Sequence, residues 1–496
     1  MKTKIIFIWL VTFLLTSCQD EFLTIVPETA LSSATFFTKE ADFQQAVNGA
    51  YVPLRSIVND RAWLLGEMHS DNTYYARNIL FGATEQQEDI ADFAIPVAGG
   101  VTSNTHVLNQ YRLDYQIISR TNQVLALIDD VEFGEASKNN LKGQAYFLRA
   151  FAYFELVRYF GKVPLHLEPV ENREGAALPL ASEEEIYAQI INDATEAINL
   201  LPLKSAQEAG RATSGAARTL LANVYIVQKK WAEAESLLME VVNSNEYQLI
   251  PNYAEVFSTS TGNKNNMESV FEVQFLEGSA GLNGTFIYNF LPRPMTSDEL
   301  KTITGTSNAQ PLTGEGNNIP TPDIIAAYEP GDERKDASIA YITLSGSLRD
   351  DKVYPYIKKF AKTHALHNNH GTNWPIYRYS EVLLFLAEAL NEQGKDGSMY
   401  LDLVRERAGL GAAQGDMREA IYHERRVELA FENKRWFDLV RTGRAVDVIT
   451  AYGARIKSNP LDYYYPAGAV PRSHAFTNID LYYALPADEA ALSPYF

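Results

Sequence analysis

The segment Leu141–Gly161, LKGQAYFLRAFAYFELVRYFG, constrains the fold more than any other part of the chain. Its periodicity predicts a helix with apolar and aromatic side chains around nearly the whole circumference. Such a helix must be enclosed by other helices, because it has no polar face to turn toward water. Gly161 ends the helix and Pro164 prevents its continuation. The chain therefore requires a core built from several helices.

Further helices follow this segment. One is predicted from about Glu183 to Leu201, with Ser182 as its N-cap. Two more, over residues 213–230 and 231–243, follow one another directly and predict an antiparallel pair with small residues at the contact. This pair resembles a tetratricopeptide unit, which buries its apolar face only against stacked neighbours. More such pairs are therefore expected.

Helical periodicity returns near the end of the chain, and the residues between the two helical groups differ in character. They are rich in Gly, Asn, Thr, Ser and Pro, with short strand-like runs such as residues 269–275. We predict a mainly α fold, in which a tetratricopeptide-like helical repeat scaffold carries a large loop-rich lobe containing short strands. One domain is expected over residues 18–496, with repeats mainly in 141–243 and 376–441 and the irregular lobe mainly in 59–105 and 246–374.

The N-terminal residues predict an export signal. Lys2 and Lys4 precede the apolar run Ile5–Leu15, whose 11 residues are too few for a helix that crosses a bilayer, which needs about 20. The run closes on Leu-Thr-Ser and then Cys18, the pattern of a lipoprotein signal. We expect residues 1–17 to be a signal peptide and Cys18 to carry lipid, with several acyl chains making the attachment durable.

Charge and cysteine content exclude several classes of protein. The formal net charge of −19 becomes −21 without Lys2 and Lys4, so nucleic acid is not an expected partner. Because Cys18 is the single cysteine, disulfides and cysteine metal sites are not expected either. The lipid anchor is the only contact with the membrane that the sequence requires.

Four motifs in order resemble the SusD/RagB family, the outer-membrane glycan-binding lipoproteins of Bacteroidetes-type bacteria. The resemblance spans essentially the whole chain. The motifs are CQDEFL from Cys18 with Pro27, RAFAYFELVRYFGKVPL at 149–165, LDLVRERAGL at 401–410, and ERRVELAFENKRWFDLVRTGR at 424–444.

The resemblance implies binding without catalysis and without a cofactor. Proteins of this kind sit at the outer face of a SusC-like TonB-dependent transporter, act as a lid over it, and deliver an oligosaccharide to it. Asp20 and Glu21 resemble the acidic signal that sends such lipoproteins to the cell exterior. The resemblance therefore implies a glycan ligand, a transporter partner, and anchoring in the outer membrane facing outward.

The candidate ligand-binding residues come from the two irregular stretches. A sugar has an apolar face and a rim of hydroxyl groups, so its site needs flat aromatic side chains with polar groups at their edges. We expect Trp63 and Tyr75 to matter most. The full candidate surface is Trp63, Asp71, Asn72, Tyr74 and Tyr75 from the first stretch and Phe286, Tyr288 and Phe290 from the second.

Three other interpretations stay open. A surface glycoside hydrolase needs two carboxylates flanking a cleft. Glu67 and Asp71 are near each other in sequence and could form such a pair, but no catalytic motif accompanies them. A protein-binding tetratricopeptide scaffold would not need the long loop-rich insert. His364, His367 and His370 have a spacing that suits zinc, but in an Asn- and Gly-containing loop we expect no metal.

The charged pattern of residues 424–435 predicts ion pairs on a helix face and contact with the lobe or the transporter.

Overall fold

A computed structural model describes residues 36–59, 63–76, 85–259, 264–314, 316–345 and 352–495. The predicted signal peptide and the lipid site at Cys18 lie outside these ranges. Within them, no helix combines the length and apolarity that a membrane crossing requires.

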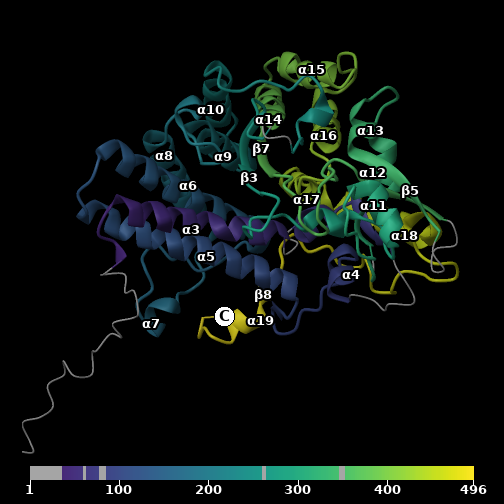
Figure 1. Ribbon diagram of the computed structural model, residues 1–496, viewed down its shortest axis with the longest axis horizontal. Helices are drawn as coiled ribbons and strands as arrows, with labels where there is room; N and C mark the ends of the chain where they lie inside the picture. The colour runs from purple at the N-terminus through teal and green to yellow at the C-terminus, as the bar shows by residue number, and fades with distance from the viewer. Residues whose placement is uncertain are drawn as a thin grey trace, which may run out of the picture.

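The long helices form one stacked array, as the sequence predicts, so the mainly helical, tetratricopeptide-like fold class is confirmed (Figure 1). α6 packs on α8, α8 on α9, α9 on α10, and α10 on α14, which in turn contacts α15 and α16. The helices of this array are α6 (Glu135–Phe160), α8 (Glu183–Leu200), α9 (Ser214–Val227), α10 (Trp231–Asn243), α14 (Tyr379–Glu392), α15 (Ser398–Arg407) and α16 (Met417–Glu428). The two helical groups that are split in sequence therefore become neighbours.

α6 is buried on almost every side, which the uninterrupted apolar circumference of its sequence requires. Gly161 follows it at φ 69°, a left-handed conformation that glycine adopts without strain. The N-terminus of α8 has the predicted cap: the Ser182 side chain accepts from the Glu185 backbone N–H, and the Glu185 carboxylate accepts from Ser182 in return.

Two long helices were not predicted. α3 (Glu40–Asn59) and α5 (Thr105–Leu127) pack on each other, and both also contact α6. The buried face of α5 contains Gln110 and Asp114 among its apolar residues, so its apolar stripe is interrupted. The side-chain amide of Gln110 donates to Asp114 at 2.9 Å, which pairs these two polar side chains inside the protein.

Two predicted helix boundaries are wrong. Residues 376–378 belong to strand β7 (Trp374–Arg378), which pairs antiparallel with β3 (Ser269–Val273), and α14 begins only at Tyr379. The helical group predicted over residues 376–441 is also interrupted, between α16 and α17 (Arg435–Arg441). Phe431 and Asn433 have positive φ values of 70° and 62° there, which no regular helix contains.

The loop-rich lobe contains short helices and strands, and two of the two-stranded sheets of the described residues lie wholly within it. β1 (Thr73–Ala76) pairs antiparallel with β4 (Gly316–Pro320), and β5 (Ile339–Leu344) pairs antiparallel with β6 (Lys352–Ile357). β2 (Val101–Thr102) and β8 (Leu485–Pro486) pair in parallel. The short helices are α4 (Glu85–Ala91), α7 (Arg173–Ala176), α11 (Ser297–Thr304), α12 (Pro322–Ala327), α13 (Arg334–Ser338) and α19 (Ala487–Ala490).

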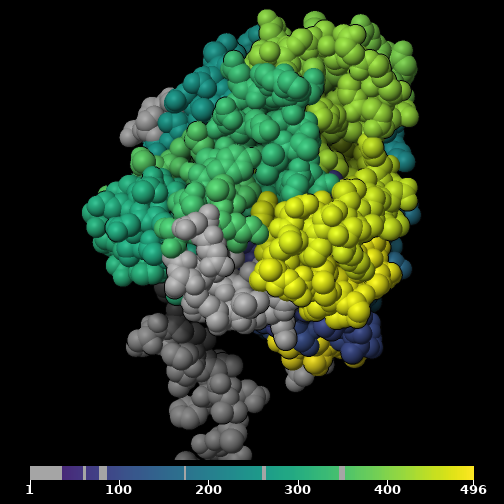
Figure 2. Space-filling view, turned by 90° about the vertical axis from the view of Figure 1, so that its right-hand side faces the viewer, coloured from purple at the N-terminus to yellow at the C-terminus, as the bar shows by residue number. Residues whose placement is uncertain are grey.

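The C-terminal part of the chain closes one side of the molecule. α18 (Ala445–Ser458) and the residues after it lie against the lobe on the face shown in Figure 2, where they are yellow beside the green residues of the insert. The contact is specific: the hydroxyl group of Tyr463 donates to Asp323 in α12 at 2.5 Å. The lobe is therefore held between the helical array and the C-terminal segment.

Candidate functional site

The predicted ligand-binding surface lies in the interior of the structure. All eight side chains are buried, and the most exposed of them, Tyr288, has a relative exposure of 3%. The prediction that they form an exposed surface is therefore corrected. The physical reason is that the two irregular stretches contact each other and the helical array, so their aromatic side chains fill the core between these parts. The eight residues are Trp63, Asp71, Asn72, Tyr74, Tyr75, Phe286, Tyr288 and Phe290.

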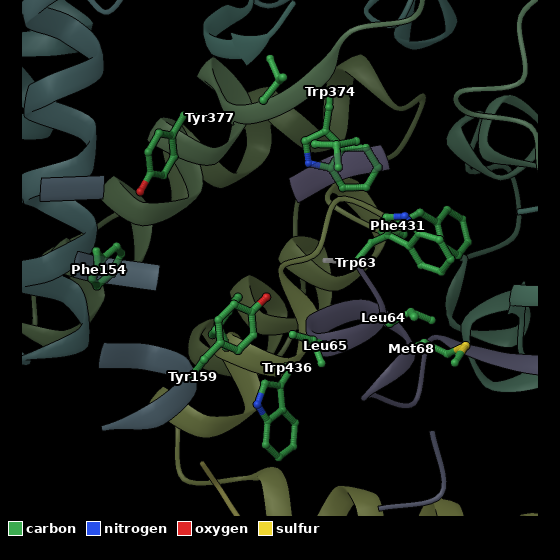
Figure 3. Close-up of a cluster of buried hydrophobic side chains, with 14 of the residues drawn as sticks. Trp63, Leu64, Leu65, Met68, Phe154, Tyr159, Trp374, Tyr377, Phe431 and Trp436 are labelled. Atoms are coloured by element: carbon green, nitrogen blue, oxygen red, sulfur yellow. The ribbon is translucent and has the colours of Figure 1, made fainter. Parts of the chain in front are cut away.

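Trp63 belongs to an aromatic core (Figure 3). Its ring packs edge-to-face on Phe290 at a centroid distance of 4.8 Å, and Phe286 and Phe290 both contact Trp374. A cavity of about 50 Å³ lies beside Trp63 and Trp374. That volume has room for a water molecule or two, since water takes about 30 Å³ in the liquid, but not for a sugar ring.

Asp71 and Asn72 hold two arginine side chains in place. The Asp71 carboxylate lies 2.9 Å from the guanidinium of Arg426 and 2.7 Å from that of Arg435. Burial alone would raise the pKa of Asp71, but the two guanidinium groups outweigh it and lower the pKa to about 2. The Asn72 amide donates to Glu67 at 3.0 Å and accepts from Arg426 at 2.9 Å. These contacts join the segment before β1 to α16 and α17.

Tyr74 and Tyr75 form a buried hydroxyl cluster with Tyr465 and Asp92. Their rings stack at a centroid distance of 4.3 Å, and the Tyr75 and Tyr465 hydroxyl oxygens are 2.7 Å apart. The Tyr75 hydroxyl donates to Asp92 at 3.1 Å. Burial, followed by the charge of Asp92, raises the pKa of both Tyr74 and Tyr75. The two rings therefore connect β1 to the C-terminal segment.

Tyr288 is the one predicted residue that reaches a cavity of useful size. Its hydroxyl oxygen lies 2.6 Å from His364 Nε2, and its ring packs against His367 at a centroid distance of 4.8 Å. Burial raises the pKa of Tyr288, so the phenol stays protonated. Tyr288 therefore connects the second irregular stretch to the histidine run.

We name the adjoining space the polar cavity. Its volume is about 450 Å³, within the range of about 300–1,000 Å³ that ligand pockets occupy. It lies where the C-terminus of α3, the N-terminus of α5, residues 285–293 and residues 367–368 meet. Its lining is Asn59, His106, Asn109, Thr285, Tyr288, Asn289, Arg293, Leu312, His367 and Asn368.

Hydrogen bonds between distant segments hold this lining. Asn59 accepts from the Thr285 backbone N–H at 2.8 Å and donates to the Asn283 carbonyl at 3.3 Å. The Arg293 guanidinium donates to the Tyr288 carbonyl at 2.8 Å. Amides, hydroxyl groups and a guanidinium suit a ligand with many hydroxyl groups, because an amide both donates and accepts hydrogen bonds. The arrangement favours binding of a polar ligand.

The histidine run contributes to this region as hydrogen-bonding groups. His364 Nδ1 lies 2.8 Å from the Lys362 carbonyl, whereas His370 is buried against Phe286 at a centroid distance of 4.7 Å. Burial, with His364 and Arg293 nearby, lowers the pKa of His367. In the described parts of the chain, no three or more His, Cys, Asp or Glu side chains are grouped to hold a metal ion.

Most residues of the polar cavity were not predicted. Asn59, His106 and Asn109 belong to the ends of α3 and α5, which were not predicted, while Asn289 and Arg293 adjoin the predicted Tyr288. No local pattern marks them, since polar residues at helix ends and in loops are ordinary. Only the packing of α3 and α5 against the insert brings them together.

Comparisons with known proteins agree with this fold. Residues 345–484 match the model of the SusD family, and residues 21–226 match a family described as starch-binding, associating with the outer membrane. The chain is 28% identical over 503 residues to SusD-like protein P2 of Formosa agariphila, covering 92% of this chain and 94% of that protein. It is 26% identical over 502 residues to SusD-like protein P25 of the same organism, with coverage of 90% and 92%.

Solved structures extend the similarity. A laminarin binding SusD-like protein has 25% identity and a TM-score of 0.73, with 92% of this chain and 98% of that chain covered. Surface glycan-binding protein A from Bacteroides uniformis has the same fold, with 23% identity, a TM-score of 0.73 and coverage of 92% and 99%. These matches, together with the two family models at opposite ends of the sequence, lead to one conclusion: the chain belongs to the SusD/RagB family.

Proposed function

We propose that this chain is a cell-surface lipoprotein that binds an oligosaccharide or polysaccharide without cleaving it. Cys18 anchors it to the outer membrane, facing the cell exterior. It delivers the captured glycan to a SusC-like TonB-dependent transporter and acts as the lid of that transporter.

The observation that carries the proposal is the polar cavity, in a chain whose fold matches a laminarin binding protein along nearly its whole length. The cavity offers amide groups from Asn59, Asn109, Asn289 and Asn368 on a rigid support of helix ends and a hydrogen-bonded loop. Rigid support matters, because groups held in place lose less conformational entropy when a ligand binds.

Among the eight predicted residues, Tyr288 is the one we place in contact with the ligand. Trp63, Tyr74, Tyr75, Phe286 and Phe290 are assigned a supporting role, because their rings are covered by other side chains. Asp71 and Asn72 join the lobe to α16 and α17 and share that role.

Calorimetric titration against a panel of polysaccharides and their oligosaccharides tests the binding function. We expect at least one glycan to bind and Asn289→Ala to weaken its affinity by about tenfold, as the loss of a direct hydrogen bond would. Asn243→Ala is the matched control, because Asn243 lies at the end of α10, outside the polar cavity. Peptide binding in place of any glycan binding would favour the protein-binding scaffold, and new reducing ends would favour a glycoside hydrolase.

Two further measurements address the other parts of the proposal. If a Trp63→Phe variant folds and binds the glycan with normal affinity, Trp63 has a packing role only. A large loss of glycan affinity would instead mean that Trp63 contacts the ligand. Affinity purification of the tagged protein from outer membranes should recover a SusC-like transporter. If the lipoprotein is recovered alone under mild detergent conditions, the lid function is rejected.

A further inference from the structure

A buried amide and a buried carboxyl group meet on α5. Gln110 and Asp114 lie one helical turn apart, and their relative exposures are 2% and 0%. The Gln110 amide nitrogen donates to Asp114 Oδ2 at 2.9 Å. Each group has a second oxygen, and among the described residues neither Gln110 Oε1 nor Asp114 Oδ1 has a hydrogen-bond partner. Two buried oxygens of adjoining groups therefore lack a donor.

The two oxygens cannot pair with each other while Asp114 is ionised, because both are acceptors. A buried polar atom without a partner forfeits the hydrogen bonds that water would supply, and a buried carboxylate forfeits more than a neutral acid does. A proton on the carboxyl group turns one of its oxygens into a donor. One proton would therefore give both oxygens a partner.

The charges around Asp114 favour the neutral acid. α6 packs along α5, and its charged residues near Asp114 are Glu155 and Arg158, whose guanidinium donates to Glu155. Burial, followed by the negative charge of Glu155, raises the pKa of Asp114 well above its usual range, against smaller opposing effects of one hydrogen bond and of Arg158. The other titratable neighbours whose pKa responds to Asp114 are Tyr159 of α6 and Tyr115 of α5.

We propose that the folded protein holds a proton on Asp114 Oδ1, which donates to Gln110 Oε1 and closes a cyclic acid–amide pair on α5. The pair then has two hydrogen bonds, one donated by the amide and one donated by the acid. The proton also removes a negative charge that would face Glu155. The packing of α5 on α6 thus depends on this proton, because an ionised Asp114 would lose one hydrogen bond and become a second buried anion beside Glu155. This device is independent of what the polar cavity binds.

A second pair of the same kind, on α8, provides the comparison. The Gln189 amide donates to Asp193 at 2.8 Å with the same spacing of four residues, and Asp193 also has a relative exposure of 0%. There, however, the Arg149 guanidinium donates to both carboxylate oxygens, at 2.8 Å each. Burial raises the pKa of Asp193, and the Arg149 guanidinium opposes that rise. Because a bidentate guanidinium compensates the charge, this pair needs no added proton.

Infrared difference spectroscopy tests the proton directly. The spectrum of the parent protein minus that of Asp114→Asn, at neutral pH, should contain the carbonyl band of a protonated carboxylic acid, and the band should shift in heavy water. The matched variant Asp193→Asn should remove carboxylate bands only. If the Asp114→Asn difference also contains carboxylate bands alone, the proposal is overturned, and that includes the case in which a water molecule bridges the two oxygens.

Stability should fall as the pH rises. The folded protein binds this proton more tightly than the unfolded chain, so the stabilisation is complete below the unfolded pKa of about 3.9 and is lost as the pH rises through the folded pKa. Burial also raises the pKa of Glu67, to about 7, and Glu67 contributes a slope of the same sign. Urea denaturation is therefore measured in a Glu67→Gln background, with and without Asp114→Asn.

The Asp114→Asn variant decides between the two forms of the carboxyl group. Its amide places a donor where the proposed proton lies, so its urea midpoint should stay near that of the background protein and depend less on pH. Asp114→Ala and Gln110→Leu, which break the pair, should each lower the midpoint. If Asp114→Asn lowers the midpoint as much as Asp114→Ala does, Asp114 acts as a carboxylate and the proposal is rejected.

Discussion

Asp71 links three parts of the fold through one buried carboxylate. It follows the π-helix at Leu64–Met68, and its two arginine partners come from α16 and α17. Asp71→Asn removes the charge and leaves two guanidinium groups buried beside a neutral amide. We expect the free energy of unfolding to fall by about 3 kcal/mol, as when one partner of a buried ion pair is removed, measured by urea denaturation.

An exposed carboxylate provides the control for Asp71. Asp488 lies 4.0 Å from Arg112, with 65% of its side chain exposed. Exposed pairs contribute about 0–1 kcal/mol, so Asp488→Asn should change the unfolding free energy very little. Equal losses in the two variants would contradict the structural role of Asp71.

Glu67 makes stability depend on pH. Burial raises its pKa to about 7, against hydrogen bonds from Asn72, Phe431 and Asn433 that lower it. The folded protein therefore holds this proton more tightly than the unfolded chain does. Consequently, the free energy of unfolding should decrease by about 2–3 kcal/mol as the pH rises from about 4.5 to about 7, then level off.

The side chain of a Glu67→Gln variant cannot ionise, so the decrease of the unfolding free energy with rising pH should disappear. Its amide group would also meet a backbone N–H that the carboxylate now accepts from, so absolute stability should fall by about 1–3 kcal/mol. Urea denaturation between about pH 5 and about pH 8 measures both effects. An equal slope in the variant and the parent protein would show that another group titrates.

At the scale of single residues, the sequence shows which side chains are able to bind a sugar, but it does not show which of them are exposed. The expectation that Trp63 and Tyr75 bind the ligand rests on the ability of aromatic side chains in loop-rich stretches to serve as sugar platforms. Both are buried, since an aromatic ring contributes as much to a core as to a binding surface. Of the eight predicted residues, only Tyr288 lines the polar cavity. Nothing in its local sequence distinguishes it from Phe286 or Phe290.

At the scale of elements, α14 and α15 depend on one glycine. A Cβ atom on Gly397 would lie 2.5 Å from the carbonyl oxygen of Ala387 and 2.9 Å from its Cα, both of which are backbone atoms. Gly397→Ala should therefore push the start of α15 away from α14. We expect a loss of about 1–3 kcal/mol in the free energy of unfolding, measured by chemical denaturation.

Gly49 is the matched comparison, because a Cβ atom there would meet nothing within 4 Å. It lies inside α3, where alanine is favoured over glycine by about 0.5–1 kcal/mol. Gly49→Ala should stabilise the protein. Stabilisation by Gly397→Ala as well would mean that α14 and α15 approach less closely than described.

Element boundaries followed local sequence where local forces dominate. The capping box at Ser182 and the limits of α10 were predictable, because the relevant contacts lie within one turn of helix. The strand at Trp374–Arg378 was not, because its hydrogen bonds come from residues about one hundred positions away in β3. The same holds for the break after α16, where Glu67 accepts from the backbone N–H groups of Phe431 and Asn433.

At the scale of the whole molecule, a buried ion network joins the lobe to the helical array. Glu428 of α16 lies 3.0 Å from Arg334 of the insert, 2.9 Å from Arg378 of β7 and 2.5 Å from Arg407 of α15. Burial alone would raise the pKa of Glu428, but the three guanidinium groups hold it well below its usual range. The ion pairs predicted for a helix face in residues 424–435 are therefore inside the protein, and they contact the lobe as expected.

Lipid attachment and ligand binding should be separable. The polar cavity is built entirely from residues 59–368, far in sequence from the predicted lipid site at Cys18. A Cys18→Ala variant should leave the membrane fraction but bind its glycan with the affinity of the lipidated protein, measured by fractionation and calorimetry. If the soluble variant binds more than about tenfold more weakly, the anchor has a part in ligand binding.

The sequence by itself determined the helical core, the repeat-like pairing of 213–230 with 231–243, and the long insert between the two helical groups. These features follow from periodicity and end signals, which act over a few residues. The tertiary structure alone decided which aromatic side chains are buried and where the polar cavity lies. Its walls come from segments more than 300 residues apart, so their meeting depends on how α3 and α5 pack against the insert, which no local pattern encodes.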